Sequence, residues 1–162
     1  MIKVKKNIPG LFGTFIILCS IACAVFAYFI APDKSPFANE MHLELGTLRP
    51  GTEVSFLRVP KLNTTNTSFL DQLLGGKVSN YKAIPVSSYT KYDSTISYTQ
   101  YGINYPKIIS IRNVLSSNDQ SVLFNKTYFL GTDKYGRDLV SRLIVATRIS
   151  LAVGFISVFI SL

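Results

Sequence analysis

The residues whose types and spacing best suit a chemical or positioning role form one motif near the C-terminal end of the 162-residue sequence. Gly131 permits a sharp turn, and Thr132 or Asp133 can accept hydrogen bonds from N–H groups at a helix start. Gly136 can relieve the backbone before a helix that is predicted to begin near Arg137. We treat this motif as a candidate structural elbow, which consists of Gly131, Thr132, Asp133, Gly136, Arg137, Asp138, Ser141 and Arg142.

The second half of the motif is typical of a helix that lies on a membrane surface. Asp138 and Arg142 are four residues apart and can form an ion pair on one face of the helix. Helical periodicity also separates a polar face from an apolar one. The polar face holds Arg137, Ser141 and Arg148, and the apolar face holds Leu139, Val140 and Leu143. We therefore predict an interfacial elbow helix within residues 129–148, which acts by geometry and not as a substrate ligand.

Side chains suited to catalysis or metal binding are few. His42 is the single imidazole, so a hydrolase would have one candidate base. Cys19 and Cys23 lie inside a long apolar run, so a Cys/His metal site has too few ligands. We predict no catalytic residue, no metal and no cofactor in this chain. His42 is expected at the surface, and the two cysteines are expected to be small packing residues.

The length allows one domain, or one domain plus a membrane segment. Hydrophobic residues make up 48% of the chain and charged residues only 16%, whereas about 25% is usual in soluble proteins. The net charge of +8 is spread out, with +3 in residues 1–6, +3 in residues 32–130 and +2 in residues 131–162. Because no basic stripe is concentrated enough to bind phosphates, the sequence argues against a nucleic-acid partner.

Residues 11–31 contain no charged side chain and are long enough to cross a hydrocarbon core of about 30 Å as a helix. Pro32 ends this predicted transmembrane helix. The flank before the run holds Lys3, Lys5 and Lys6. The positive-inside bias therefore places residues 1–10 in the cytoplasm.

Two processing alternatives compete with this membrane anchor. A secretory signal would have a shorter apolar region and a cleavage site near residues 22–24. A lipoprotein would be acylated at Cys23, but its mature N-terminus normally turns polar at once, whereas residues 24–31 stay apolar. The length of the uninterrupted run favours the anchor.

Residues 32–128 are rich in Pro, Asn, Ser, Thr and Tyr, in contrast to the apolar run before them, and are predicted to form an extracytoplasmic, mainly β domain. Apolar and polar residues alternate over residues 53–59, 107–115 and 121–130, as in short strands. One short helix is predicted over residues 68–74. Its sequence signals are a capping box formed by Ser68 and Asp71 and a stop at Gly75-Gly76.

The tyrosines and the glycosylation patterns of this domain are weak evidence for a binding surface. Six tyrosines lie between Tyr81 and Tyr105, and they could form a binding surface, but half-buried strand residues are the favoured interpretation. Three glycosylation patterns begin at Asn63, Asn66 and Asn125, and they matter only in a eukaryotic secretory route. These features therefore do not identify a ligand for the domain.

Residues 149–162 form a second apolar run of only 14 residues. This length is too short to cross a bilayer. No polar cap or basic flank follows the run. We expect these residues to be the start of a second transmembrane helix in a truncated sequence.

Taken together, these features resemble the start of a binding-protein-dependent ABC transporter permease of the dipeptide/oligopeptide "C" type. The resemblance is strong over residues 129–162, supportive over residues 1–37 and weak between them. Its motifs are Gly131-Thr132-Asp133-x-x-Gly136-Arg137-Asp138-x-x-Ser141-Arg142 and Arg148-Ile149-Ser150-Leu151. The loop between the helices is longer than this family usually has, and the cytoplasmic coupling loop is absent.

The resemblance implies a non-enzymatic subunit of the bacterial plasma (inner) membrane, multi-pass when complete, that moves peptides or similar small solutes by alternating access. The implied partners are a second permease subunit, two cytoplasmic ATPase subunits that bind ATP and Mg, an extracytoplasmic solute-binding protein and membrane lipid. Residues that bind substrate are not identified. The alternative is a single-pass anchored extracytoplasmic domain for binding or adhesion.

Overall fold

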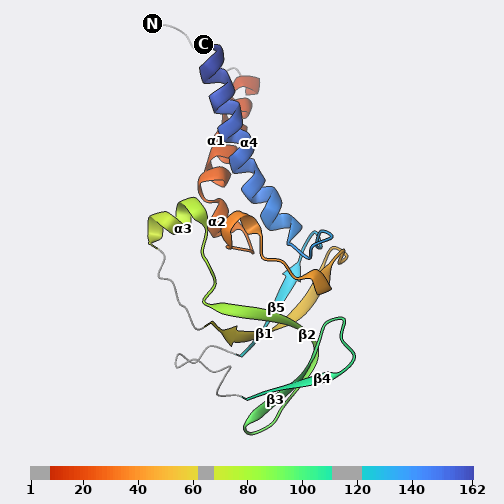
Figure 1. The fold of residues 1–162 in the computed structure, drawn as a ribbon. Helices are drawn as coiled ribbons and strands as arrows, with labels where there is room; N and C mark the ends of the chain where they lie inside the picture. The colour runs from red at the N-terminus through yellow and green to blue at the C-terminus, as the bar shows by residue number, and fades with distance from the viewer. Residues whose placement is uncertain (1–7, 62–67, 111–121) are drawn as a thin grey trace, which may run out of the picture.

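The computed structural model describes residues 8–61, 68–110 and 122–162. Two long apolar helices extend from one side of a small antiparallel β-sheet (Figure 1). Along the chain, the first of these helices precedes the strands of the sheet and the second follows them. The lysines of the predicted cytoplasmic flank and the patterns at Asn63 and Asn66 lie outside the described residues.

The first apolar run forms α1 (Ile8–Val25) and a short helix α2 (Ala27–Ile30), whereas a single helix was predicted over residues 11–31. The two helices are separate because the backbone of Phe26 leaves the helical conformation, with φ of −94° and ψ of 17°. Ala31 is extended, as the residue before a proline prefers. By length and composition, α1 is apolar enough to cross a membrane.

Two short 3-10 turns, η1 (Pro36–Ala38) and η2 (Leu43–Leu45), lie between α2 and the sheet. The helix α4 packs against η1. His42, which was expected at the surface, is buried and its ring lies 5.1 Å from the ring of Phe56. Its position could not be predicted locally, because Phe56 belongs to a strand that follows later in the chain.

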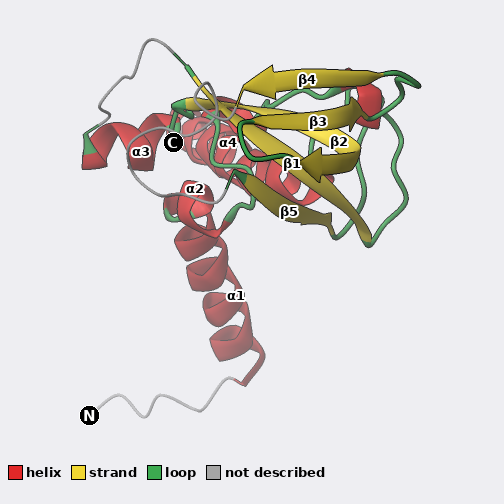
Figure 2. Cartoon of the chain, turned by 90° about the horizontal axis from the view of Figure 1, so that it is seen from below, coloured by secondary structure: helices red, strands yellow, loops and turns green. Residues whose placement is uncertain are grey.

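Five strands form one sheet in the order β4-β3-β2-β1-β5, and every neighbouring pair is antiparallel (Figure 2). The strands are β1 (Thr52–Pro60), β2 (Tyr81–Lys91), β3 (Thr95–Gln100), β4 (Pro106–Ser110) and β5 (Leu123–Tyr128). The strand predicted over residues 53–59 is confirmed by β1. Strand β4 overlaps the predicted run 107–115 and β5 lies within the predicted run 121–130, although residues 111–115 and 121 lie outside the described residues.

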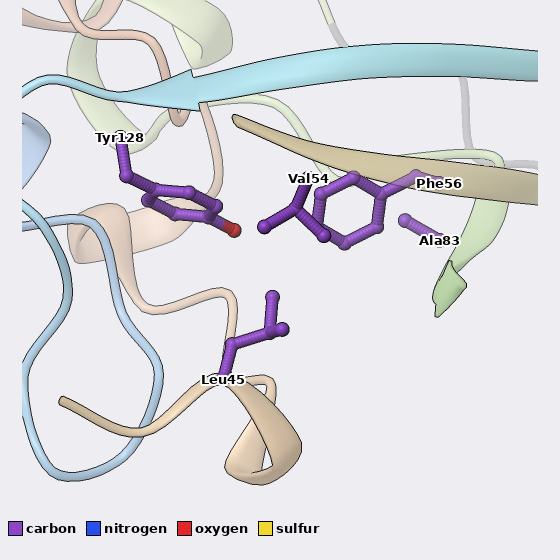
Figure 3. Packing of buried hydrophobic residues seen from close by; sticks show 5 residues of the cluster. All are labelled: Leu45, Val54, Phe56, Ala83 and Tyr128. Carbon is purple, nitrogen blue, oxygen red and sulfur yellow. The ribbon is translucent and has the colours of Figure 1, made fainter. Parts of the chain in front are cut away.

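Small apolar clusters cover both faces of the sheet. On one face lie Leu45, Val54, Phe56, Ala83 and Tyr128 (Figure 3). On the other lie Leu57, Val86, Ile96 and Tyr98. Strand β1 contributes to both clusters because side chains alternate along a strand. Several tyrosines expected to be half-buried are instead largely exposed, namely Tyr89, Tyr92 and Tyr105.

Tyr128 is the largest fully buried side chain of the first cluster. Its hydroxyl is buried and has no hydrogen-bond partner among the described residues. Burial, followed by the negative charges of Glu40, Asp138 and Asp33, raises the pKa of this phenol well above its usual value. The hydroxyl therefore stays protonated at the end of β5, where the chain turns toward the last helix.

The predicted short helix is confirmed as α3 (Phe69–Gly75), with Ser68 as its N-cap. The backbone N–H of Ser68 donates to the carboxylate of Asp71 at 3.3 Å, as a capping box requires. Gly76 follows with φ of +82°, and a Cβ at this position would lie 2.8 Å from the carbonyl oxygen of Lys34. The helix therefore ends where the two glycines predicted.

The last helix, α4 (Leu139–Ser161), is continuous over 23 residues, and by length and composition it is also apolar enough to cross a membrane. The structure therefore contains neither the separate interfacial helix predicted within residues 129–148 nor a new helix beginning at Ile149. The helices α1 and α4 run in opposite directions, contact each other, and diverge away from the sheet (Figures 1 and 2). Their apolar side chains remain largely exposed.

Candidate functional site

The candidate motif lies where the sheet ends and α4 begins. Its residues fold against the segment that follows α2, and we call this contact between residues 33–48 and residues 131–142 the helix junction. Within the motif, the backbone N–H of Gly136 donates to the carbonyl of Asp133 at 3.0 Å. The N–H of Asp133 donates to the carbonyl of Arg137 at 3.1 Å, so the chain forms a narrow loop before the helix.

Both motif glycines occupy positions that other residues could not. Gly131 has φ of +75° and Gly136 has φ of +71°, in the left-handed region that favours glycine. A Cβ on Gly131 would lie 2.1 Å from the carbonyl oxygen of Leu48. On Gly136 it would lie 1.7 Å from the carbonyl oxygen of His42. The sharp turn expected at Gly131 and the positive φ or close approach expected at Gly136 are both confirmed.

Thr132 joins the motif to η2 and the residues after it. Its hydroxyl donates to the carbonyl of Leu45 at 2.5 Å and accepts a bond from the N–H of Leu48 at 2.8 Å. Its own N–H donates to the carbonyl of Leu48 at 3.3 Å. Thr132 is buried, so these bonds satisfy polar groups that water does not reach. Thr132 therefore links two segments far apart in the sequence and does not cap a helix.

Asp133 organises the loop through both carboxylate oxygens. Its Oδ1 accepts bonds from the N–H groups of Tyr135 at 2.9 Å and Arg137 at 3.0 Å. Its Oδ2 accepts bonds from Nε of Arg137 at 2.7 Å and Nη1 of Arg142 at 2.8 Å. Burial opposes the charge, but the bonds from Arg137 and Tyr135 outweigh it and lower the pKa of Asp133 from 3.8 to about 2.

Asp138 caps α4 and connects it to the segment after α2. Its Oδ1 accepts the N–H of Val140 at 3.2 Å, and its Oδ2 accepts the hydroxyl of Ser141. The oxygen of Ser141 in turn accepts the N–H of Asp33 at 2.8 Å. All three linked residues, Asp33 with its backbone N–H and Asp138 and Ser141 with their side chains, are buried. This chain of bonds fixes the first turn of α4 against residue 33.

The structure corrects two predictions about the first turns of α4. The predicted ion pair between Asp138 and Arg142 is not formed, because the loop places the carboxylate of Asp133 beside Arg142. The predicted faces are also wrong, since Ser141 is fully buried and Leu143 is 60% exposed. The inward face of the helix is instead defined by Ser141 and Val145, four residues apart.

The partners that the motif contacts were not predicted from the sequence. Asp33, Asn39, His42, Leu45 and Leu48 all lie on the segment after α2. Only Asp33 carried a local signal, because Asp-x-Ser-Pro is typical of a side chain that bonds to its own backbone. Its carboxylate does accept the N–H groups of Ser35 and Glu40, at 2.8 and 3.1 Å.

The helix junction is suited to holding elements together. Its carboxylates are satisfied by backbone N–H groups, hydroxyls and arginines. Within residues 8–61, 68–110 and 122–162, no group of three His, Cys, Asp or Glu side chains could hold a metal ion. What the arrangement can do is to fix the direction in which α4 leaves the sheet.

Comparison with known proteins relates a short part of the chain to a transport protein. A stretch of 37 residues is 57% identical to the dipeptide transport system permease protein DppC of Haemophilus influenzae. This stretch is 23% of the present chain and 12% of the length of that protein. No protein-family model matches the chain. No solved structure matches it either.

Proposed function

We propose that this chain is a permease subunit of an ABC importer and forms part of the transmembrane pathway for peptides or similar small solutes. The observation that carries the proposal is the 57% identity over 37 residues to a dipeptide transport system permease protein. A subunit of this kind is not an enzyme and needs no cofactor of its own. Its energy comes from partner ATPases that bind ATP and Mg.

The two long helices support a place in the inner membrane. α1 and α4 are about 27 and 35 Å long at 1.5 Å per residue, close to the thickness of a hydrocarbon core. Their large apolar side chains are mostly exposed, which requires a cover of lipid or of further helices. Because the helices run in opposite directions, the sheet lies on one side of the membrane.

Orientation follows from charge. The lysines of residues 1–10 precede α1, so these residues belong in the cytoplasm and the sheet belongs outside. We therefore place the lysine-rich N-terminal residues inside, α1 and the part of α4 beyond the helix junction in the membrane, and the sheet between them outside, so that the helix bounds replace the predicted spans 11–31 and 149–162. The complete subunit is multi-pass.

Transport would require this subunit to move as a unit with its partners. We propose a second permease subunit, two cytoplasmic ATPase subunits and an extracytoplasmic solute-binding protein as those partners. In alternating access, the helices tilt while the pathway opens first to one side and then to the other. The role of the elbow residues, Gly131, Thr132, Asp133, Gly136, Arg137, Asp138, Ser141 and Arg142, is to make α4 and the outer domain tilt together.

Uptake of labelled dipeptide tests the function directly. A strain that lacks this gene should lose ATP-dependent dipeptide uptake and regain it with the intact gene, while uptake of a free amino acid by another system stays unchanged. The presence of the protein in the membrane of the complemented strain at the wild-type amount, measured by immunoblot, is the control. Normal uptake of dipeptides and longer peptides in the deletion strain would overturn the proposal.

The alternative of a single-pass anchored adhesion domain is not favoured. It treats the C-terminal apolar run as an amphipathic tail. However, the most apolar 18 residues of α4 have the same mean hydropathy as those of α1, 2.2, and α4 carries exposed apolar residues on several sides. A helix of this kind is typical of a second membrane span.

A further inference from the structure

A patch of exposed apolar side chains surrounds the place where the helices meet the sheet. The short helix α3 contributes Phe69, Leu70 and Leu74, each more than 60% exposed. Phe29 and Ile30 of α2 extend the patch, and it continues into the exposed apolar side chains of α1 and α4. Soluble surfaces rarely carry so many large apolar residues in one place.

The orientation of α3 is fixed by contacts with its neighbours. The ring of Phe69 lies 5.8 Å from the ring of Phe29 on α2. Nη1 of Arg148 on α4 donates to the carbonyl of Leu73 at 2.9 Å. As a result α3 lies crosswise to α4, beside α2 and at the base of the two long helices (Figures 1 and 2). This is the arrangement of a helix that lies on a membrane surface beside membrane-crossing helices.

A groove opens where α1, α3 and α4 meet. It has a volume of about 240 Å³. Its walls are Ile21, Ala24, Val25, Leu73, Leu74, Leu151 and Phe155, with Arg148 as the one charged residue among them. The groove is therefore an apolar slot with a cation at its edge.

We propose that α3 lies in the outer surface of the lipid bilayer and that an acyl chain of an outer-leaflet phospholipid occupies the groove. The apolar patch is continuous with the sides of α1 and α4, so the lipid that covers these helices also reaches α3. The inference rests on the proposed function to the extent that this function places α1 and α4 in a membrane.

Arg148 accounts for the chemical class of the lipid. Its guanidinium has five N–H donors, and Nη1 is the one that bonds to Leu73. The guanidinium also lies 5.7 Å from the centre of the Tyr28 ring. Tyrosine is a residue type that favours the membrane surface. An arginine at this depth can direct its charge toward a phosphate group while its stem stays among apolar side chains. The occupant is thus a phospholipid and not a neutral hydrocarbon.

The chain contains no tryptophan, so single tryptophans can report the depth of chosen positions. The Leu70→Trp and Leu74→Trp variants of the 162-residue chain are placed in two sets of phospholipid nanodiscs, in which the acyl chains carry bromine near the headgroup or, for positions in the middle of the membrane, near the chain end. Bromine quenches a tryptophan that it touches. Phe15→Trp, on an exposed position of α1, serves as the membrane control, and Tyr92→Trp, in the turn between β2 and β3, as the aqueous control.

We expect the emission of the Leu70→Trp and Leu74→Trp variants to fall about twofold relative to unbrominated lipid, because interfacial helices lie about 5–10 Å into the headgroup region. Tyr92→Trp should be unchanged. If Phe15→Trp is quenched while both α3 variants are quenched only by aqueous iodide, or by neither agent, the inference fails and the proposed function stands. If Phe15→Trp is itself not quenched, the membrane placement fails, and with it both proposals.

Discussion

The α-carbon of Gly136 packs directly against the carbonyl group of His42, so closely that no side chain fits between them. The contact joins the loop before α4 to the segment after α2. His42 itself is buried at this point, with its ring against Phe56. The contact between one glycine and one peptide group thus ties the start of α4 to the sheet.

Replacing Gly136 by alanine should therefore abolish correct folding of the junction. The alanine Cβ would overlap the carbonyl of His42 and would also hold an unfavourable positive φ. Gly102→Ala is the matched control, because Gly102 has φ of +78° but open space around its α-carbon. The control should cost about 1–2 kcal/mol. In dipeptide uptake, the Gly136→Ala variant should be inactive and the Gly102→Ala variant active, and equal uptake would contradict the packing described.

Asp133→Asn should destabilise the protein more than the same substitution at an exposed aspartate does. The substitution removes the charge that Arg137 and Arg142 share, at a cost of about 1.5–3 kcal/mol. The measurement is the midpoint of thermal unfolding in detergent. Asp93→Asn, in the exposed turn between β2 and β3, is the control and should leave the midpoint unchanged. Equal midpoints for both variants would show that the arginines find other partners.

The low pKa of Asp133 predicts a specific loss of stability in acid. The folded protein holds this pKa near 2, whereas the unfolded chain has the ordinary value of 3.8. The contribution of Asp133 is therefore complete above pH 3.8 and is lost as the pH falls toward 2. The difference in unfolding midpoint between the wild type and Asp133→Asn should shrink over this range. A constant difference down to pH 2 would contradict the assigned shift.

Ser141→Ala should weaken the attachment of α4 to the segment after α2. The serine oxygen accepts the N–H of Asp33, and its hydroxyl donates to Asp138, so the substitution leaves buried groups without partners. The expected cost is about 1–3 kcal/mol in unfolding free energy. Ser157→Ala, on the exposed part of the same helix, should change little because its hydroxyl bonds only to the helix backbone in the structure described. A similar effect of both changes would argue against the attachment.

Thiol labelling tests the proposed topology. In a background with Cys19 and Cys23 replaced by serine, single cysteines at Ser88 and Ser94 should react with a membrane-impermeant reagent in intact cells, because both positions are exposed on the sheet that we propose to lie outside. Labelling after cell lysis gives the total amount of reactive thiol. Protection of both cysteines until lysis would place the sheet in the cytoplasm.

Local patterns predicted several elements of the fold, although the predicted alternating runs did not include β2 and β3. The charge-free run, the alternation along β1 and the capping box of α3 each depend on neighbours in the sequence, and each is present in the structure. The positive φ of Gly131 and Gly136 was predictable for the same reason, because a glycine in a turn motif has a local cause.

The contacts of the motif were not predictable from such patterns. Arg142 pairs with Asp133 and not with Asp138 because the loop that contains Asp133 bends back toward the helix. This bend depends on the close approach of Gly131 and Gly136 to the carbonyl groups of Leu48 and His42. The inward face of α4 was assigned wrongly for a related reason. Ser141 faces inward because Asp33 offers it an N–H group, and Asp33 lies 108 residues away in the sequence.

The hydrogen bonds between Thr132 and residues 45 and 48 have a consequence for the modular construction of the protein. They hold the beginning and the end of the segment that forms the sheet side by side, as the closed neck of a loop. The chain folded beyond this neck can therefore grow or shrink without changing the distance between the ends of the two helices, since a longer loop costs only about 0.6 kcal/mol for each doubling of its length.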